Sequence, residues 1–187
     1  MDMPTPTKID NSNWRQYAAG SIDASQWSAV VPAAGRGSRL GYDCPKILYP
    51  IAGRPGIHWL LDLLAPNCGH IVFVLSPDGR GPVEEELSHG FWGRYDVAVQ
   101  EVPTGMGDAV ELALPLVTSR HTVIVWGDQV ALRRSSVDAC MRLHAGPLAP
   151  DVTCPTVFRK TPYIHFDRDS DDHITGMRQA RDRKSVV

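Results

Sequence analysis

Apolar and polar positions along this chain form blocks that predict strands separated by helices. Short runs rich in β-branched and apolar residues are typical of buried strands, and they occupy residues 28–33, 70–75, 95–100 and 122–126. Longer helical patterns lie between and after them, at residues 56–65, 82–88, 107–117 and 135–145. Pro115 interrupts the third helix, and Ser135 or Ser136 is expected to cap the last.

Strands that are apolar on both faces and separated by helices indicate a parallel sheet covered on both sides. Right-handed crossovers between such strands build a doubly wound sandwich. We therefore predict an α/β fold with a doubly wound, mostly parallel, Rossmann-like sheet.

The two ends of the chain depart from this pattern. Residues 1–27 are polar and rich in Pro, Ser and Asn, so we expect an N-terminal extension ahead of one domain at 28–181. Beyond residue 150 the pieces VTCPTVFRK, PYIHF and HITGM resemble short strands, and DRDSDD predicts a hairpin turn. Residues 182–187 match one reading frame of a common sequencing adapter. We expect a non-native tail on a domain truncated at its C-terminus, with a natural basic tail as the alternative.

The amino-acid composition and the net charge exclude some classes of function. The 187 residues are 43% hydrophobic and 21% charged with net charge −2, so nothing indicates electrostatic capture of nucleic acid or a membrane surface. Four scattered cysteines without a CxxC pair favour reduced thiols over disulfides or zinc, and no apolar leader is visible. We expect a cytoplasmic protein without a membrane segment. A homo-oligomer is compatible with the sequence.

The first strand runs into a glycine-rich turn with two nearby cations, in the segment VVPAAGRGSRLGYDCPK. Ligands of open α/β sheets bind at the carboxyl ends of strands, where small residues let backbone N–H groups approach an anion. The guanidinium group of Arg39 could form paired hydrogen bonds with phosphate, and Lys46 would add a point charge. The alternative is a tight strand-to-helix connection with two solvated cations. The segment is not a P-loop and resembles GxGxxG only loosely.

Two later segments end at the same predicted edge. In VIVWGDQV, a strand leads into Asp128, and one carboxylate with phosphate oxygens and water is how Mg²⁺ is usually held. In VQEVPTGMGDAVELAL, Gly105 and Gly107 would let the backbone contact a planar ligand before a helix that begins at Asp108. The alternatives are a strand-end turn aspartate and an ordinary capped helix start.

These segments together resemble nucleotidyltransferases that make nucleotide-sugars, whose signature is AAGxGxR followed by PK. The second segment is similar to the GTGxA loop of UDP-N-acetylglucosamine pyrophosphorylases. The resemblance implies that Arg39 and Lys46 are catalytic and that Asp128 binds metal. It also implies a nucleotide-binding set comprising Ala33, Ala34, Gly35, Gly37, Ser38, Gln100, Gly105 and Met106. Met106 replaces the threonine usual at a base-reading position.

The reaction that this resemblance implies joins a nucleoside triphosphate, with UTP favoured, to a sugar 1-phosphate and releases pyrophosphate, with Mg²⁺ as cofactor. Arg39 would hold the leaving phosphates and Lys46 the charge near the α-phosphate. Gln179 stands where relatives carry a glutamate for the sugar, which leaves the sugar unidentified.

Three other interpretations stay open. The cytidylyltransferase of isoprenoid synthesis opens with a similar VVPAAGxGxRM and CPK, but PTGMGDAV and WGDQV depart from its later motifs. A molybdopterin-cofactor nucleotidyltransferase is more distant. A non-catalytic nucleotide-binding regulatory domain would keep the site without the chemistry.

Overall fold

The computed structural model describes residues 14–18, 20–35, 41, 44–171 and 173–179. The chain divides into two compact units, one up to Thr153 and one from Cys154 onward. The first unit contains the predicted sheet, and the second contains a separate hairpin.

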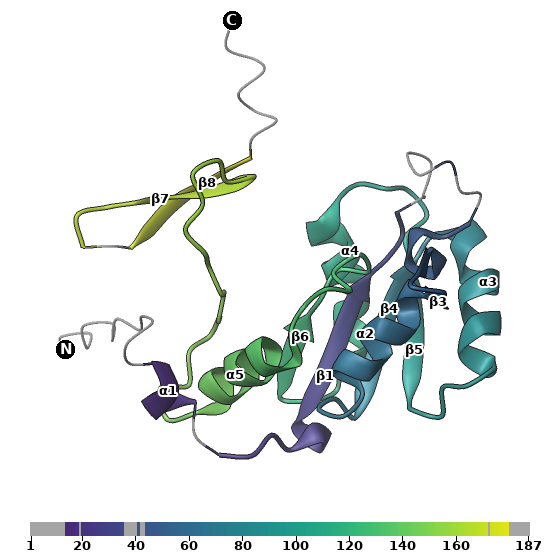
Figure 1. Ribbon diagram of the computed structural model, residues 1–187, viewed down its shortest axis with the longest axis horizontal. Helices are drawn as coiled ribbons and strands as arrows, with labels where there is room; N and C mark the ends of the chain where they lie inside the picture. Colours follow the sequence, from purple (N-terminus) through teal and green to yellow (C-terminus); the bar gives the residue numbers. More distant parts are fainter. Residues whose placement is uncertain (1–13, 19, 36–40, 42–43, 172, 180–187) are drawn as a thin grey trace, which may run out of the picture. The chain divides into compact units, whose positions relative to one another are not determined.

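A four-stranded parallel sheet forms the centre of the first unit (Figure 1). Its order is β5-β4-β1-β6, and all three neighbouring pairs are parallel. The strands lie within two residues of the predicted positions, at β1 (Trp27–Pro32), β4 (His70–Leu75), β5 (Tyr95–Val99) and β6 (His121–Ile124). The predicted fold class is confirmed.

Helices connect these strands and cover both faces of the sheet. The four longer ones are α2 (Gly56–Leu64), α3 (Pro77–Ser88), α4 (Met106–Ala113) and α5 (Arg134–Ala145). Short helical turns complete the unit, namely α1 (Trp14–Tyr17) and the 3-10 helices η1 (Ala24–Gln26), η3 (Lys46–Leu48) and η4 (Leu114–Leu116). Among the described residues, no helix is both long and apolar enough to cross a membrane.

Two predicted helix starts and one predicted helix cap were wrong. Helix α3 begins five residues earlier than predicted, because the Ser76 hydroxyl accepts the Gly79 N–H and proline suits the first helical position. Helix α4 begins two residues before Asp108. The N-cap of α5 is Arg133 without a side-chain bond, so neither predicted serine caps it.

The core lies on both faces of the sheet because side chains alternate along each strand. Ala29, Val31 and Phe73 face one way and pack with the buried residues of α2, α3 and α5. Val30 and Val72 face the other way and pack with α4. This two-sided burial is what the continuous apolar runs predicted.

The second unit is an antiparallel hairpin of β7 (Ile164–Arg168) and β8 (Ile174–Gln179). Asp169 Oδ1 accepts the backbone N–H groups of Asp171 and His173, which confirms the turn predicted for DRDSDD. The strand predicted in VTCPTVFRK is wrong, because no described segment pairs with it and Pro155 lacks a donor.

The amino-terminal end of the sheet holds a ring cluster of Trp27, His121 and His144. The His121 ring lies 4.9 Å from the Trp27 ring and 5.3 Å from the His144 ring, between centroids. Desolvation lowers the pKa of His121, and the neighbouring His144 and Arg120 lower it further. The folded chain therefore disfavours the charged imidazole more than the unfolded chain does.

This lowered pKa predicts a pH effect on stability. Below the unfolded pKa of about 6.5, the unfolded chain binds more protons at this position, so stability falls as pH decreases toward the folded pKa. We expect His121→Gln to reduce the stability difference between about pH 7.5 and pH 5.5, measured by urea unfolding. His89→Gln, which removes an exposed histidine, is the control. An unchanged pH difference in His121→Gln would contradict the assignment.

Candidate functional site

The segments that follow β1 and β6 lie side by side at the carboxyl edge of the sheet. The Ala33 N–H donates to the Val74 carbonyl at 2.8 Å, and the Gly127 N–H donates to the Pro32 carbonyl at 3.0 Å. These bonds extend the ladder beyond the strands themselves. The segment that begins at Ala33 and the turn formed by Gly127 and Asp128 therefore meet, as the parallel arrangement predicted.

Gly127 is the closest point of this contact. A Cβ atom on Gly127 would lie 2.8 Å from the Ala33 Cβ and 3.2 Å from the Pro32 carbonyl oxygen. Side chains do not normally approach so closely, so only glycine fits without a backbone shift. The sequence analysis did not single out this glycine for packing. Its position directly after a strand was the available signal.

Lys46 and Asp128 form an ion pair at this edge, although 82 residues separate them in the sequence. Lys46 Nζ lies 2.5 Å from Asp128 Oδ2. Their side chains are 44% and 46% exposed, so the pair contributes little to stability and remains accessible to a ligand. The structure brings together two of the three predicted charged residues, and their roles remain predictions.

Lys46 is held near the first turn by its backbone. Its N–H donates to the Gly35 carbonyl at 3.5 Å, and η3 starts at this residue. Pro45 packs against the first turn of α3, where a Cβ on Gly79 would lie 3.4 Å from its ring. Pro45 and Lys46 are therefore held at the sheet edge.

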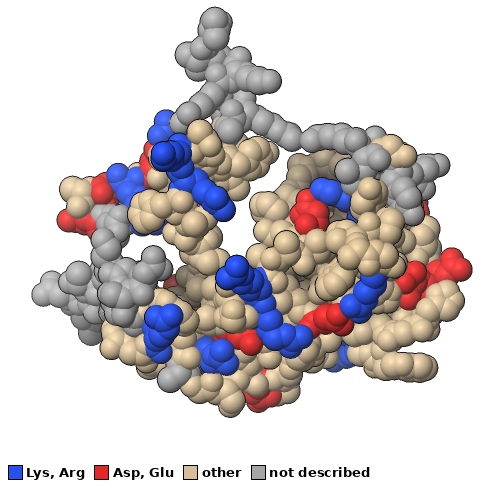
Figure 2. Space-filling view, in the orientation of Figure 1, with Lys and Arg blue, Asp and Glu red and all other residues tan. Residues whose placement is uncertain are grey.

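Of the residues predicted in the first turn, Ala33 and Ala34 are half-buried and Gly35 is exposed. Gly37, Ser38 and Arg39 lie outside the described residues. Acidic and basic side chains are interspersed over the face of the molecule shown in Figure 2. Because the whole chain has a net charge of −2, a site for an anionic ligand depends on local groups rather than on a broad positive field.

A small hairpin follows Lys46 and leads into α2. It pairs β2 (Pro50–Ile51) with β3 (Arg54–Pro55). Ala52 and Gly53 form its tip with φ of 52° and 79°. The left-handed conformation costs the alanine some strain, so contacts beyond the turn must stabilise this hairpin.

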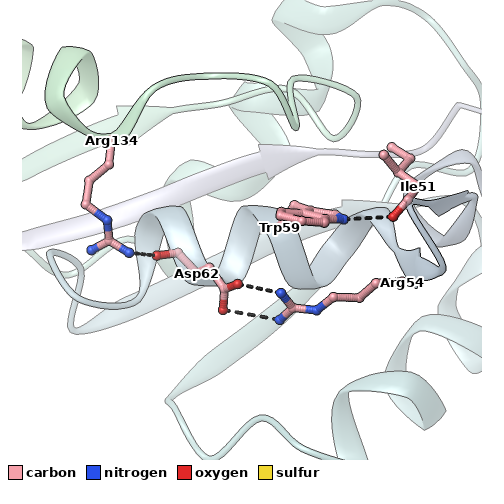
Figure 3. Close-up of polar contacts among 5 residues, drawn as sticks. All are labelled: Ile51, Arg54, Trp59, Asp62 and Arg134. Carbon is pink, nitrogen blue, oxygen red and sulfur yellow. Dashed lines mark hydrogen bonds and ion pairs between the residues drawn. The ribbon is translucent and has the colours of Figure 1, made fainter.

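Those contacts come from α2, which is bonded in turn to α5 (Figure 3). Arg54 donates to both carboxylate oxygens of Asp62, at 2.6 and 3.2 Å, and lies over the Trp59 ring. The Trp59 indole N–H donates to the Ile51 carbonyl at 3.1 Å. Arg134 donates to the backbone carbonyl of Asp62. These contacts were not predicted from the sequence, because the residues that form them lie in separate elements.

We expect Asp62→Asn to lower the free energy of unfolding by less than about 1 kcal/mol, because the ion pair between Asp62 and Arg54 is exposed. Arg54 holds the pKa of Asp62 below its usual value, so the contribution is present near neutral pH and lost in acid. Urea unfolding near pH 7 and near pH 3 tests this. A loss that persists in acid would contradict the ion-pair explanation.

Gln100 follows β5 at the same edge and is 5% exposed. Its side-chain Nε2 donates to the Gly105 carbonyl at 3.1 Å and to Asp108 Oδ2 at 2.9 Å. The Thr104 hydroxyl donates to the same carboxylate oxygen. The hydrogen bonds from Thr104 and Gln100 lower the pKa of Asp108, and the bond from Thr104 has the larger effect.

The loop between β5 and α4 is therefore organised around one carboxylate. Gly105 has φ of 131°, a conformation that glycine adopts without strain, and it precedes the helix as N-cap. Met106, the first helical residue, is 41% exposed. The sequence analysis selected Gln100, Gly105 and Met106 but not Thr104 or Asp108. A threonine followed by an acid in the first helical turn was the available signal.

A divalent cation fits the donor set at Asp128. Oδ2 pairs with Lys46, and a single protein carboxylate completed by phosphate oxygens and water is typical of Mg²⁺ sites. Among the described residues, the one group of three possible metal-binding side chains is Asp169, Asp171 and His173 in the hairpin unit. A metal at Asp128 would thus depend on the nucleotide for further ligands.

Several proteins of known sequence are similar to most of this chain. The bifunctional protein GlmU of Sorangium cellulosum is 31% identical over 168 residues, covering 83% of this chain and 34% of the relative. The bifunctional protein GlmU of Alkalilimnicola ehrlichii is 33% identical over 162 residues, covering 83% and 33%. The chain therefore spans about a third of the length of these relatives.

Solved structures agree with the fold. A nucleotidyl transferase from Methanothermobacter thermautotroptrophicus superposes with a TM-score of 0.51 at 25% identity, covering 62% of this chain and 56% of that one. The inositol-1-phosphate CTP transferase from T. maritima gives 0.50 at 25% identity, covering 58% and 45%. The resemblance to nucleotidyltransferases stated from the sequence is confirmed.

Residues 29–187 match the family described as "MobA-like NTP transferase domain", which includes every described segment of the site above. The chain therefore belongs to the family of MobA-like NTP transferase domains.

Proposed function

We propose that this chain transfers a nucleotidyl group from UTP to a sugar 1-phosphate and releases pyrophosphate, with Mg²⁺ as the metal. The observation that carries the proposal is the Lys46–Asp128 pair beside the segment 33–35. The resemblance of the segment VQEVPTGMGDAVELAL to the GTGxA loop of UDP-N-acetylglucosamine pyrophosphorylases favours UTP.

In this reaction a phosphate oxygen of the sugar phosphate attacks the α-phosphorus in line. The bond from the α-phosphorus to the bridging oxygen of the β-phosphate breaks, and pyrophosphate leaves with that electron pair. The attacking oxygen is already ionised at neutral pH, so no general base is required. Catalysis then consists of positioning and charge stabilisation.

The residues of this chain take separate parts in the proposal. The backbone N–H groups of Ala34 and Gly35 contact the phosphates, since the Ala33 N–H is used in the sheet, and Lys46 stabilises negative charge developing near the α-phosphate. Asp128 holds the metal, which when bound neutralises phosphate charge and orients the phosphates for displacement. Gln100 and the Gly105 backbone contact the base. Arg39 holds the β- and γ-phosphates.

A cytidylyl transfer is the second candidate, because the T. maritima structure with 25% identity is a CTP transferase. Calorimetric titration of the chain with UTP, CTP, GTP, dTTP and ATP, with and without Mg²⁺, separates the candidates. Preference for UTP in Mg²⁺ supports the proposal, and preference for CTP supports the second candidate. Binding that is independent of Mg²⁺ favours a non-catalytic domain, and no binding of any nucleotide refutes all three.

A further inference from the structure

The Gln100 side chain has a fixed orientation, and its hydrogen bonds define it. The groups that face Nε2 are the Gly105 carbonyl, the Asp108 carboxylate and, at 3.5 Å, the Thr104 hydroxyl oxygen. The first two are acceptors only, and the Thr104 hydroxyl donates its own proton to Asp108. Turning the amide over would set the carbonyl oxygen Oε1 against two acceptors at about 3 Å, which is repulsive. The amide can therefore adopt one orientation only.

The same bonds decide which end of the amide remains available. Both protons of Nε2 are used within the loop, whereas Oε1 accepts no hydrogen bond from the described residues. Gln100 consequently presents an acceptor and no donor.

Asp108 is the group that enforces this choice. The Gly105 carbonyl alone would bias the amide weakly, but a carboxylate forms the stronger, charge-assisted bond. The Thr104 hydroxyl donates to Asp108 Oδ2, and this bond helps to keep the carboxylate ionised and in place. Asp108 also lies in the first turn of α4, where a negative charge is favourable.

We propose that Asp108, supported by Thr104, is a positioning residue for base selection, fixing the Gln100 amide so that Oε1 accepts a hydrogen bond from an N–H group of the base. The inference rests on the proposed function, in which this loop contacts the base. Uracil carries such a donor at N3, where cytosine has a lone pair. An acceptor held in one orientation should therefore favour UTP over CTP.

The test compares UTP and CTP affinities of the full chain in Mg²⁺ by calorimetry. Asp108→Asn keeps the shape but lets residue 108 donate as well as accept, so the Gln100 amide can reverse. We expect the UTP-to-CTP affinity ratio to fall about 10-fold, the scale of one hydrogen bond with an unsatisfied partner. Thr104→Val should reduce the ratio in the same direction by a smaller factor.

Glu111→Gln is the matched control, because it removes one negative charge from an exposed position on the same helix. Its ratio should equal that of the wild type. A second comparison adds Asp108→Asn to the Gln100→Ala variant. The double variant should have the same UTP-to-CTP affinity ratio as Gln100→Ala, because the amide that Asp108 orients is absent from both.

The outcomes are distinct. The inference would be overturned if the UTP-to-CTP affinity ratio were unchanged in Asp108→Asn, which includes the case in which both affinities change by the same factor. The proposed function would remain intact in that case. Equal binding of UTP and CTP by the wild type would also overturn it. A wild-type chain that binds no nucleotide would refute the proposed function and this inference together.

Discussion

Replacing Lys46 with alanine is expected to lower kcat about 100-fold or more, and Asp128→Ala should cost a similar factor. Each variant removes one preorganised charge from the edge where the phosphates are proposed to react, and the loss of one such contact has this scale. Pyrophosphate release measures turnover, and calorimetry with UTP and Mg²⁺ measures affinity. Affinity should also fall, by about 10-fold or more, because a charged hydrogen bond is lost.

Arg80→Ala is the matched control for these variants. Arg80 also belongs to an exposed ion pair, with Glu84 at 3.0 Å, but it lies within helix α3. Surface pairs of this kind contribute at most about 1 kcal/mol to stability, so turnover and affinity should stay at wild-type values. Wild-type turnover in Lys46→Ala or Asp128→Ala would contradict the roles assigned to them.

Replacing Gly127 with alanine is expected to lower the free energy of unfolding by about 1–3 kcal/mol, the usual cost of forcing a methyl group into a filled space. The new Cβ would lie 2.8 Å from the Ala33 Cβ, so the turns after β6 and β1 must move apart. Because Asp128 is the next residue, turnover should fall as well. Urea unfolding and pyrophosphate release measure the two effects.

Gly90→Ala provides the opposite case. Gly90 is exposed, lies just after α3 without a positive φ, and a Cβ there would meet nothing within 4 Å. Alanine restricts the unfolded chain more than glycine does, so this variant should be as stable as the wild type or more stable by up to about 1 kcal/mol. If Gly127→Ala proved as stable as Gly90→Ala, the close approach of the two turns would not constrain the site.

The secondary structure was largely predictable, and its errors have specific causes. Continuous apolar runs such as 70–75 are distinctive, since both faces of these strands are buried. The start of α3 was missed because its first turn, PDGRG, has little apolar character, whereas Ser76 and Pro77 determine where it begins. Arg133 precedes α5 where a serine cap was expected.

The candidate site was predictable in part. Lys46 and Asp128 could be selected because each follows a strand-associated motif, and parallel strands bring their carboxyl ends to one edge. The roles assigned to the residues of the first turn and to the metal ligand remain predictions. Thr104, Asp108 and Gly127 were not selected, because their importance depends on contacts with side chains or backbone elsewhere.

The succession of strands and helices along the chain, the parallel sheet and the edge at which the motifs gather could all be predicted from the sequence. These follow from the spacing of apolar residues and from the chirality of the connections, which act locally. Three contacts could be learned from the folded structure alone: Lys46 pairs with Asp128, Ala33 leaves room for glycine alone at position 127, and Gln100 donates to Asp108. Such contacts depend on distances of a few tenths of an ångström between distant segments, and no pattern along one chain encodes those distances.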